Sequence, residues 1–155
     1  MLRFEIPGRD DLVLTTLLLD YNGTIARDGE LIPELIDRIK ELQKDLQVLV
    51  LTADTYGNVR SQCEPHGIEV RTFPRAGAGE CKEEIARSFS SGVVSLGNGF
   101  NDQAMFDASD LAIAVLDDEG IYAGLLKHAD ILVKNPMDGL DLLLKKDRLR
   151  ATLRS

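Results

Sequence analysis

The sequence predicts a doubly wound α/β sandwich, in which helices cover both faces of a mainly parallel sheet. From residue 47 onward, strand patterns alternate with helix patterns along the chain. Strand patterns such as Val48–Leu51 are wholly apolar, as expected of strands that are buried on both faces. In such folds ligands bind at the carboxyl ends of the strands, where the loops converge.

The elements can be predicted in order along the chain. Apolar and polar residues alternate from Leu2 to Ile6 before a glycine turn, which predicts an N-terminal hairpin over about residues 1–14. Asp28–Gly29 lies between short apolar segments and predicts a second hairpin, a small flap. Pro33 then begins a helix. The remaining predictions are strands 47–52, 68–73, 93–96, 111–115 and 131–133, a helix beginning at Thr55, and helices 80–89, 101–108, 119–127 and 136–144.

Size and composition are those of one folded domain. The chain has 155 residues, of which 44% are hydrophobic and 28% charged. Its apolar runs are shorter than the roughly 20 residues that a membrane helix needs, and its first residues do not form a signal peptide. We therefore expect a single cytoplasmic domain over residues 1–155 that does not associate with membranes.

The charge is acidic overall but unevenly distributed. A formal charge of −8 disfavours nucleic acid and anionic membranes as general partners. Bases nevertheless outnumber acids over residues 145–155, which form a basic C-terminal tail. This tail could lie on the chain's own acidic body, on a neighbouring subunit, or on an RNA or phosphoprotein. Cys63 and Cys81 match no disulfide or zinc pattern.

Four segments carry candidate chemistry. Asp20 ends an apolar run and is followed by a turn at Gly23, which presents its carboxylate as a nucleophile. A carboxylate can attack a phosphoryl group only where a metal ion, a lysine or backbone N–H groups neutralise the negative charges. Thr52 and Ala53 follow a strand and precede a helix start, where a phosphate can bind. Lys82 and the segment Gly97–Asp102 complete the set.

Two other interpretations fail on spacing. Asp102 occupies the position at which the dinucleotide-binding pattern G-x-G-x-x-G requires its third glycine. A calcium loop beginning at Asp20 would need glycine at Ile25 and glutamate at Leu31. Neither NAD binding nor calcium sensing is expected.

Together these segments resemble the haloacid dehalogenase superfamily. Thr52–Asp54 and Asn101–Asp102 are most similar to the phosphorylation domain of P-type ATPases. The resemblance implies a Mg²⁺-dependent phosphatase or phosphotransferase that forms an aspartyl-phosphate on Asp20. Its substrate would be a phosphorylated small molecule or a phosphoprotein. The spacings leave no room for a cap domain, and we expect a capless protein that forms a homo-oligomer.

The resemblance also assigns a role to each matching residue. Arg75 and Lys134 are alternatives to Lys82 as the source of positive charge. Asp110 is expected to be structural, and Asp54 to cap a helix or contact substrate. The catalytic residues are expected to be Asp20, Asn22, Thr52 and Lys82, the phosphate-binding residues Tyr21, Thr52, Ala53 and Lys82, the supporting residues Gly23, Thr24 and Asn101, and the Mg²⁺ ligands Asp20, Asn22, Asn98 and Asp102.

Two residues depart from the superfamily pattern. Asn22 stands where phosphatases usually have an aspartate that acts as general acid and base, and loss of such help typically costs about 10²–10⁴ in rate. Asn98 stands where an aspartate usually binds Mg²⁺, so a weaker metal site is expected. We therefore expect slow turnover, with a weakly active or inactive regulatory or binding module as the alternative.

Overall fold

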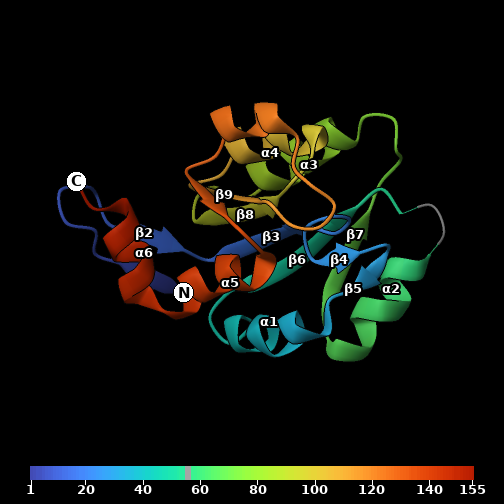
Figure 1. Cartoon of the computed structure of the whole chain (residues 1–155), viewed down its shortest axis with the longest axis horizontal. Helices are drawn as coiled ribbons and strands as arrows, with labels where there is room; N and C mark the ends of the chain where they lie inside the picture. Colours follow the sequence, from blue (N-terminus) through green and yellow to red (C-terminus); the bar gives the residue numbers. More distant parts are fainter. Residues whose placement is uncertain (55–56) are drawn as a thin grey trace.

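A computed structural model of the chain describes residues 1–54 and 57–155. Its centre is a six-stranded sheet in which every neighbouring pair of strands is parallel (Figure 1). The predicted doubly wound α/β sandwich is confirmed. In spatial order the strands are β10 (Ile131–Val133), β9 (Leu111–Val115), β8 (Val93–Gly97), β3 (Thr16–Asp20), β6 (Gln47–Thr52) and β7 (Glu69–Thr72).

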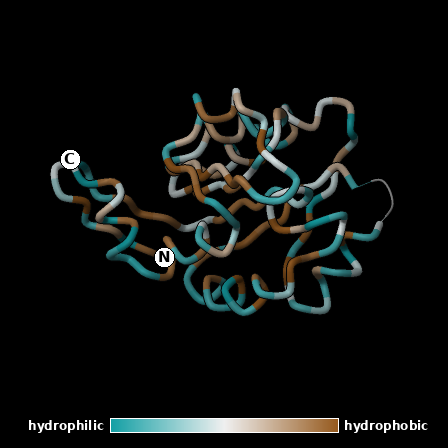
Figure 2. The backbone as a smooth tube through the Cα atoms, in the orientation of Figure 1, coloured by the Kyte–Doolittle hydropathy of each residue, from teal (hydrophilic) through white to brown (hydrophobic). Residues whose placement is uncertain are grey.

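Helices cover both faces of this sheet. The helices α1 (Ile36–Leu42) and α5 (Pro136–Leu144) lie on one face, and α3 (Ala78–Arg87) and α4 (Gln103–Asp107) on the other (Figure 1). Side chains of β3 alternate between two apolar clusters, one on each face. The sheet forms the hydrophobic centre of the trace in Figure 2. The other helical segments are α2 (Asn58–Cys63) and the short 3₁₀ helices η1 (Pro33–Leu35), η2 (Glu64–His66), η3 (Phe100–Asp102) and η4 (Ala123–Lys127).

The prediction of a helix over 119–127 is wrong, because only η4 forms there. Gly120 ends a turn with a positive φ of 78°, and its N–H donates to the carbonyl of Asp117. Tyr122 is extended, and its N–H donates to the carbonyl of Asn98 at 2.8 Å. The predicted start of another helix at Thr55 lies outside the described residues, and α2 begins at Asn58.

The two ends of the chain pack together beside the sheet. Strands β1 (Leu2–Phe4) and β2 (Leu12–Leu14) form an antiparallel hairpin, and α6 (Lys146–Leu153) lies against it (Figure 1). We call β1, β2 and α6 the arm. Leu149 of α6 is buried in the same apolar cluster as the hairpin. Most of the segment predicted as a basic tail is therefore an ordered helix.

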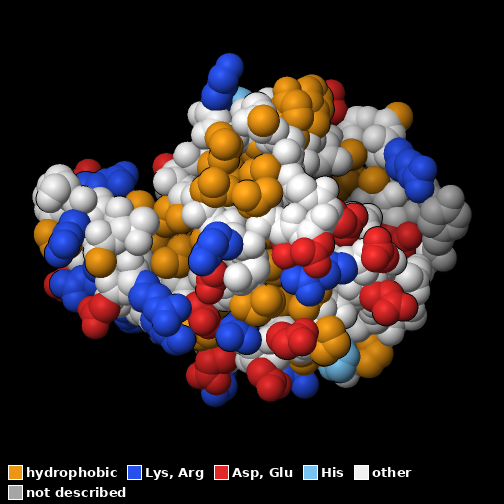
Figure 3. Space-filling model, viewed as in Figure 1, with side chains coloured by type: hydrophobic (Ala, Val, Ile, Leu, Met, Phe, Trp, Pro, Cys, Tyr) orange, Lys and Arg blue, Asp and Glu red, His pale blue; other side chains and the backbone are white. Residues whose placement is uncertain are grey.

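Asp141 of α5 ties the arm to the body. Its carboxylate accepts from Arg38 on α1 at 2.9 Å and from Lys145 at 3.3 Å, and it lies 3.7 Å from Arg148 on α6. Burial raises the pKa of Asp141, but the hydrogen bonds and charges of Arg38 and Lys145 outweigh this effect and lower it. Basic side chains gather over the arm, and acidic ones over the region of the flap (Figure 3).

None of the helices in the described part of the chain combines the length and the apolar character needed to span a bilayer.

Candidate active site

The predicted site residues meet at the carboxyl ends of three central strands. In the sheet register Asp20, the last residue of β3, lies beside Leu51 of β6, and Leu19 lies beside Leu96 of β8. The chain runs from β3 to β6 on one side and returns to β8 on the other, so this edge is a topological switch point. A cleft of about 960 Å³ opens there. Every predicted site residue lines it except three that lie beneath its surface, Gly23, Thr24 and Asp102.

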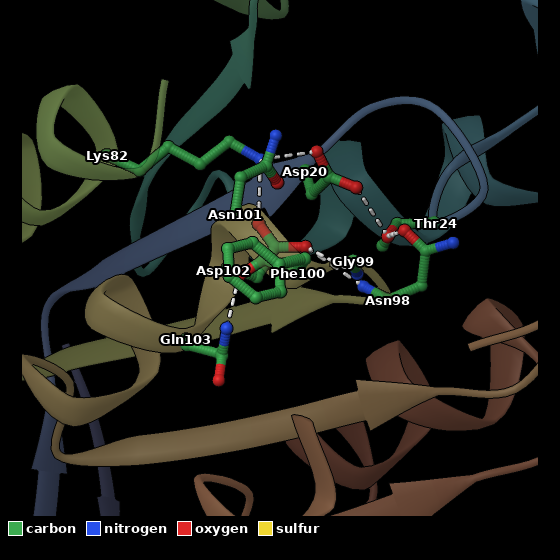
Figure 4. Close-up of polar contacts among 9 residues, drawn as sticks. All are labelled: Asp20, Thr24, Lys82, Asn98, Gly99, Phe100, Asn101, Asp102 and Gln103. Carbon is green, nitrogen blue, oxygen red and sulfur yellow. Dashed lines mark hydrogen bonds and ion pairs between the residues drawn. The ribbon is translucent and has the colours of Figure 1, made fainter. Parts of the chain in front are cut away.

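Lys82 joins two carboxylates at the floor of the cleft. Its Nζ lies 2.7 Å from Asp20 Oδ1 and 2.7 Å from Asp102 Oδ1, and it donates to Asn101 Oδ1 at 3.0 Å (Figure 4). The side chain is 1% exposed and comes from α3 on one face of the sheet. Burial opposes its positive charge, but Asp20 and Asp102 outweigh burial and raise the pKa of Lys82. Of the alternatives to Lys82, Arg75 lines the cleft and Lys134 does not.

Asp102 is fully buried and holds the loop after β8. Its Oδ2 accepts from the backbone N–H groups of Asn98 at 3.1 Å and Gly99 at 2.9 Å. Burial and the Asp20 charge raise the pKa of Asp102 to about 6, against the opposing effect of Lys82. A Cβ on Gly97 would lie 2.5 Å from Asp102 Cγ, so only glycine leaves room for this carboxylate.

The turn after β3 is shaped by a glycine and a threonine. Gly23 has a φ of 76°, and a Cβ there would lie 2.2 Å from Asn98 Nδ2. The Thr24 hydroxyl donates to Asp20 Oδ2 at 2.9 Å, which fixes the second oxygen of the carboxylate. Tyr21 has a buried ring whose hydroxyl donates to the carbonyl of Gly29 at 3.0 Å.

The oxygen donors near Asp20 fit a hard divalent cation. Asn98 donates through Nδ2 to the carbonyl of Gly120 at 3.2 Å, and its Oδ1 lies 3.3 Å from the Thr24 hydroxyl that also contacts Asp20. This amide therefore turns its oxygen toward Asp20. Among the described residues no group of three or more His, Cys, Asp or Glu could hold a metal, so a cation bound here would also need neutral oxygen ligands. The exposed Asn22 follows Asp20 by two residues and lines the cleft.

The remaining predicted residues form the opposite wall. Thr52 ends β6 and is buried, and Ala53 follows it at the cleft surface. Asp54 accepts from the N–H of Val59 in the first turn of α2 at 2.9 Å, although the N-cap residue of that helix is Gly57, and Asp54 also lines the cleft. The two roles predicted for Asp54, helix cap and substrate contact, both stay open. Asp110 accepts from two backbone N–H groups at the start of β8, in agreement with the structural role predicted for it.

The flap is held from two sides. It consists of β4 (Ala26–Arg27) and β5 (Glu30–Leu31). Arg27 binds Asp117 through both oxygens at 3.0–3.2 Å. Gln62 of α2 accepts from the N–H of Leu31 at 2.6 Å and donates to the carbonyl of Gly29 at 2.9 Å. These contacts place the flap beside the cleft, which the turn residue Gly29 lines.

Sequence reasoning assigned no separate role to Phe100, which also lines the cleft. A lone aromatic residue between Gly99 and Asn101 was the available signal, because the rest of this loop is polar or glycine.

Known proteins share this fold at low sequence identity. The cobalt-bound deoxy-D-mannose-octulosonate 8-phosphate phosphatase of Haemophilus influenzae superposes with a TM-score of 0.72, covering 92% of this chain and 94% of that one at 14% identity. Putative HAD-family hydrolases superpose as well. The chain has the haloacid dehalogenase (HAD) fold. The described residues form the sheet, its helices, the flap and the arm, and they include no cap domain.

Two other matches concern the predicted similarity to the phosphorylation domain of P-type ATPases. A zinc-transporting PIB-type ATPase superposes with a TM-score of 0.63 at 23% identity, over 79% of this chain and 20% of that protein. A soluble P-type ATPase-like phosphatase of Methanocaldococcus jannaschii is 28% identical over 139 residues, which cover 86% of this chain and 50% of that protein. The predicted resemblance is confirmed by these matches.

An uncharacterized protein of the same organism is 44% identical over 62 residues, 40% of this chain and 67% of that protein. No protein-family model matches the chain. The chain spans only about half the length of the curated phosphatase relative.

Proposed function

We propose that the protein is a divalent-metal-dependent phosphatase or phosphotransferase in which Asp20 is the nucleophile. The observation that carries this proposal is the position of Asp20, at the floor of an open cleft with a fully buried lysine at 2.7 Å. Curated relatives named as phosphatases support the reaction class. The substrate would be a phosphorylated small molecule or a phosphoprotein.

The reaction would proceed by two displacements at phosphorus. A carboxylate oxygen of Asp20 attacks the bound phosphoryl group, the bond from phosphorus to the leaving oxygen breaks, and the leaving group departs with the electron pair. Water or another acceptor then attacks the aspartyl-phosphate, loses a proton to solvent, and frees the Asp20 carboxylate. Lys82 opposes the negative charge that develops on the phosphoryl oxygens.

A cation is needed because the site is negatively charged. Asp20 and Asp102 carry two negative charges against one positive charge on Lys82, and a phosphate group would add more. Mg²⁺ held by Asp20, the carbonyl of Asn22 and Asn98 would supply positive charge beside the phosphate. The predicted ligand Asp102 does not line the cleft, and its two oxygens accept from Lys82 and from the backbone N–H groups of Asn98 and Gly99, so we place it in support of Lys82 and not on the ion. In the neighbouring 3-deoxy-D-manno-octulosonate 8-phosphate phosphatase of Moraxella catarrhalis, magnesium and phosphate ions are bound together.

Because of Asn22 we expect a low rate of turnover. An amide can neither protonate a leaving group nor take a proton from water, so turnover should be slow and should favour leaving groups that are stable as anions. The same residue, together with Asn98, supports a second candidate function. In that case the chain binds phosphate and a divalent cation as a regulatory module, without significant turnover.

Turnover of p-nitrophenyl phosphate and acetyl phosphate with Mg²⁺ tests these proposals. Asp20→Asn keeps the size of the side chain and should reduce turnover to background, whereas the exposed control Asp10→Asn should not. Mass spectrometry of the acid-quenched protein should find a phosphoryl group on the peptide that contains Asp20. Equal rates in wild type and Asp20→Asn would remove the enzyme proposal and leave the binding module.

A second variant tests the explanation of the rate. Asn22→Asp restores a general acid and base and should accelerate hydrolysis by about 10²-fold. An unchanged rate would show that the missing acid is not what limits turnover.

A further inference from the structure

Phe100 is an exposed aromatic residue at the rim of the cleft. Its side chain is 66% exposed, although it belongs to the loop that carries Asn98, Asn101 and Asp102 (Figure 4). A single exposed apolar residue is common on protein surfaces and by itself needs no explanation. Phe100 differs from most exposed apolar residues because it lies within the loop that binds Lys82.

The Phe100 ring packs against a second aromatic ring, that of Tyr122. It meets the ring of Tyr122 in a T-shaped contact, with centroids 5.2 Å apart and planes at 67°. Tyr122 is held by its N–H bond to the carbonyl of Asn98. A Cβ on Gly124 would lie 2.5 Å from the Tyr122 ring, so glycine at this position leaves room for the ring. The aromatic pair is therefore fixed to the catalytic loop on one side and still exposed on the other.

A second hollow adjoins the cleft at this ring. It measures about 450 Å³, within the range of small-molecule sites. Arg75, Phe100 and Asn101 line both spaces, so a ligand can extend from one into the other across the Phe100 ring. The rest of the lining comes from Gly77, from four residues of α3 that include Glu80 and Glu83, and from Gln103 and Ala104 of α4.

We propose that Phe100 and this hollow bind the leaving group of the substrate, and that the substrate is a phosphate ester of a phenol. The inference rests on the proposed function, because it requires the phosphate to lie at Asp20. An aromatic ring on the ester packs against Phe100, and such ring pairs contribute enough for about a 2–10-fold change in affinity.

The chemistry of the site is consistent with the same class and excludes esters of aliphatic alcohols. Asn22 cannot protonate the leaving oxygen, so the departing group must be stable as an anion. A phenol is acidic, with a pKa near 10 for the tyrosine side chain, whereas aliphatic hydroxyls of serine and threonine do not ionise in the accessible range. An aryl ester therefore matches both Phe100 and Asn22.

Binding of two phosphonates tests the inference without requiring turnover, because their carbon–phosphorus bond is not hydrolysed. Phenylphosphonate and methylphosphonate are titrated by calorimetry into the Mg²⁺-loaded wild type, Phe100→Leu and Phe100→Tyr. Wild type and Phe100→Tyr should bind phenylphosphonate about 2–10-fold more tightly than methylphosphonate, and Phe100→Leu should lose this preference. Leu132→Ala, which truncates an exposed side chain of β10 away from the cleft, is the matched control and should keep it.

The outcomes separate this inference from the proposed function. Equal affinities in wild type, no binding of either phosphonate, or an unchanged preference in Phe100→Leu would overturn the aromatic subsite, even if Asp20-dependent turnover is found. A phenyl preference that depends on Phe100, in a protein without Asp20-dependent turnover, would support the subsite and remove only the enzyme proposal. Thermal unfolding of each variant checks that it is folded.

Discussion

Removal of the Lys82 charge should destabilise the protein strongly, because this lysine neutralises two carboxylates in the interior. Its Nζ lies 2.7 Å from both Asp20 and Asp102, and the side chain is almost completely buried. Lys82→Met keeps most of the side-chain length and removes only the ammonium group. Two carboxylates then share one site with no opposing charge.

The expected cost follows from that arrangement. Removing one partner of a buried ion pair typically costs about 3–5 kcal/mol, since the remaining charge is buried without compensation. In a protein of this size, 1 kcal/mol corresponds to a shift of about 2–4 °C in Tm. Lys82→Met should therefore lower Tm by roughly 10 °C or more at pH 8 in the presence of EDTA.

The loss should depend on pH. Burial raises the pKa of Asp102 to about 6 even with Lys82 present, and removal of the lysine raises it further. As the pH falls, a carboxyl group whose native pKa is raised takes up its proton in the native state at a higher pH than in the unfolded state. The stability of the protein therefore rises as the pH falls toward the pKa of the unfolded state. The difference between wild type and Lys82→Met should therefore be smaller at pH 5 than at pH 8.

Thermal unfolding followed by circular dichroism measures these shifts. The exposed Lys40→Met on α1 is the control and should change Tm by little. Adding Asp102→Asn to Lys82→Met removes one of the unpaired charges and should restore part of the lost stability. A cost below about 1 kcal/mol for Lys82→Met, or no recovery in the double variant, would refute the charge argument.

Three further predictions concern the surroundings of this site. The basic neighbours of Asp141 lower its pKa, so the stability that its carboxylate contributes is present above the unfolded value of 3.8 and is lost as the pH falls through the native pKa. Asp141→Asn should therefore cost about 1 kcal/mol at pH 7 and little at pH 2. Chemical unfolding measures this cost, with the exposed Asp147→Asn as control. Gly97→Ala should cost about 1–3 kcal/mol in the same assay, since its Cβ meets Asp102, and a neutral effect would contradict the close approach. Asn98→Asp should tighten Mg²⁺ binding measured by calorimetry, and weaker binding would place Asn98 outside the metal site.

The strands and the central contact of the site could be predicted because local patterns determine them. Apolar runs ended by Asp20, Thr52 and Gly97 predicted three strands whose carboxyl ends meet. Lys82 was assigned to Asp20 by resemblance, and the structure places the two side chains in contact. Their catalytic and metal-binding roles stay predictions.

The parts that could not be predicted depend on contacts between distant residues. The segment 119–127 has the spacing of an amphipathic helix, but its backbone instead donates to the carbonyl of Asn98 and turns at Gly120. The helix α6 is highly charged, and its buried anchor Leu149 meets a hairpin from the opposite end of the chain. Local sequence carries no signal for either contact.

Under the proposed function, residues at the rim of the cleft are the candidates for substrate selection. The described residues include no cap domain, and the flap is bound on two sides, to Asp117 by Arg27 and to α2 through Gln62. Under the proposed function, groups already in position at the rim can contribute to discrimination at low entropic cost. The phosphate end is common to all candidate substrates, so we expect discrimination to act on the leaving group. Phe100 is the large apolar side chain that stands in position for this contact, between the cleft and the adjoining hollow.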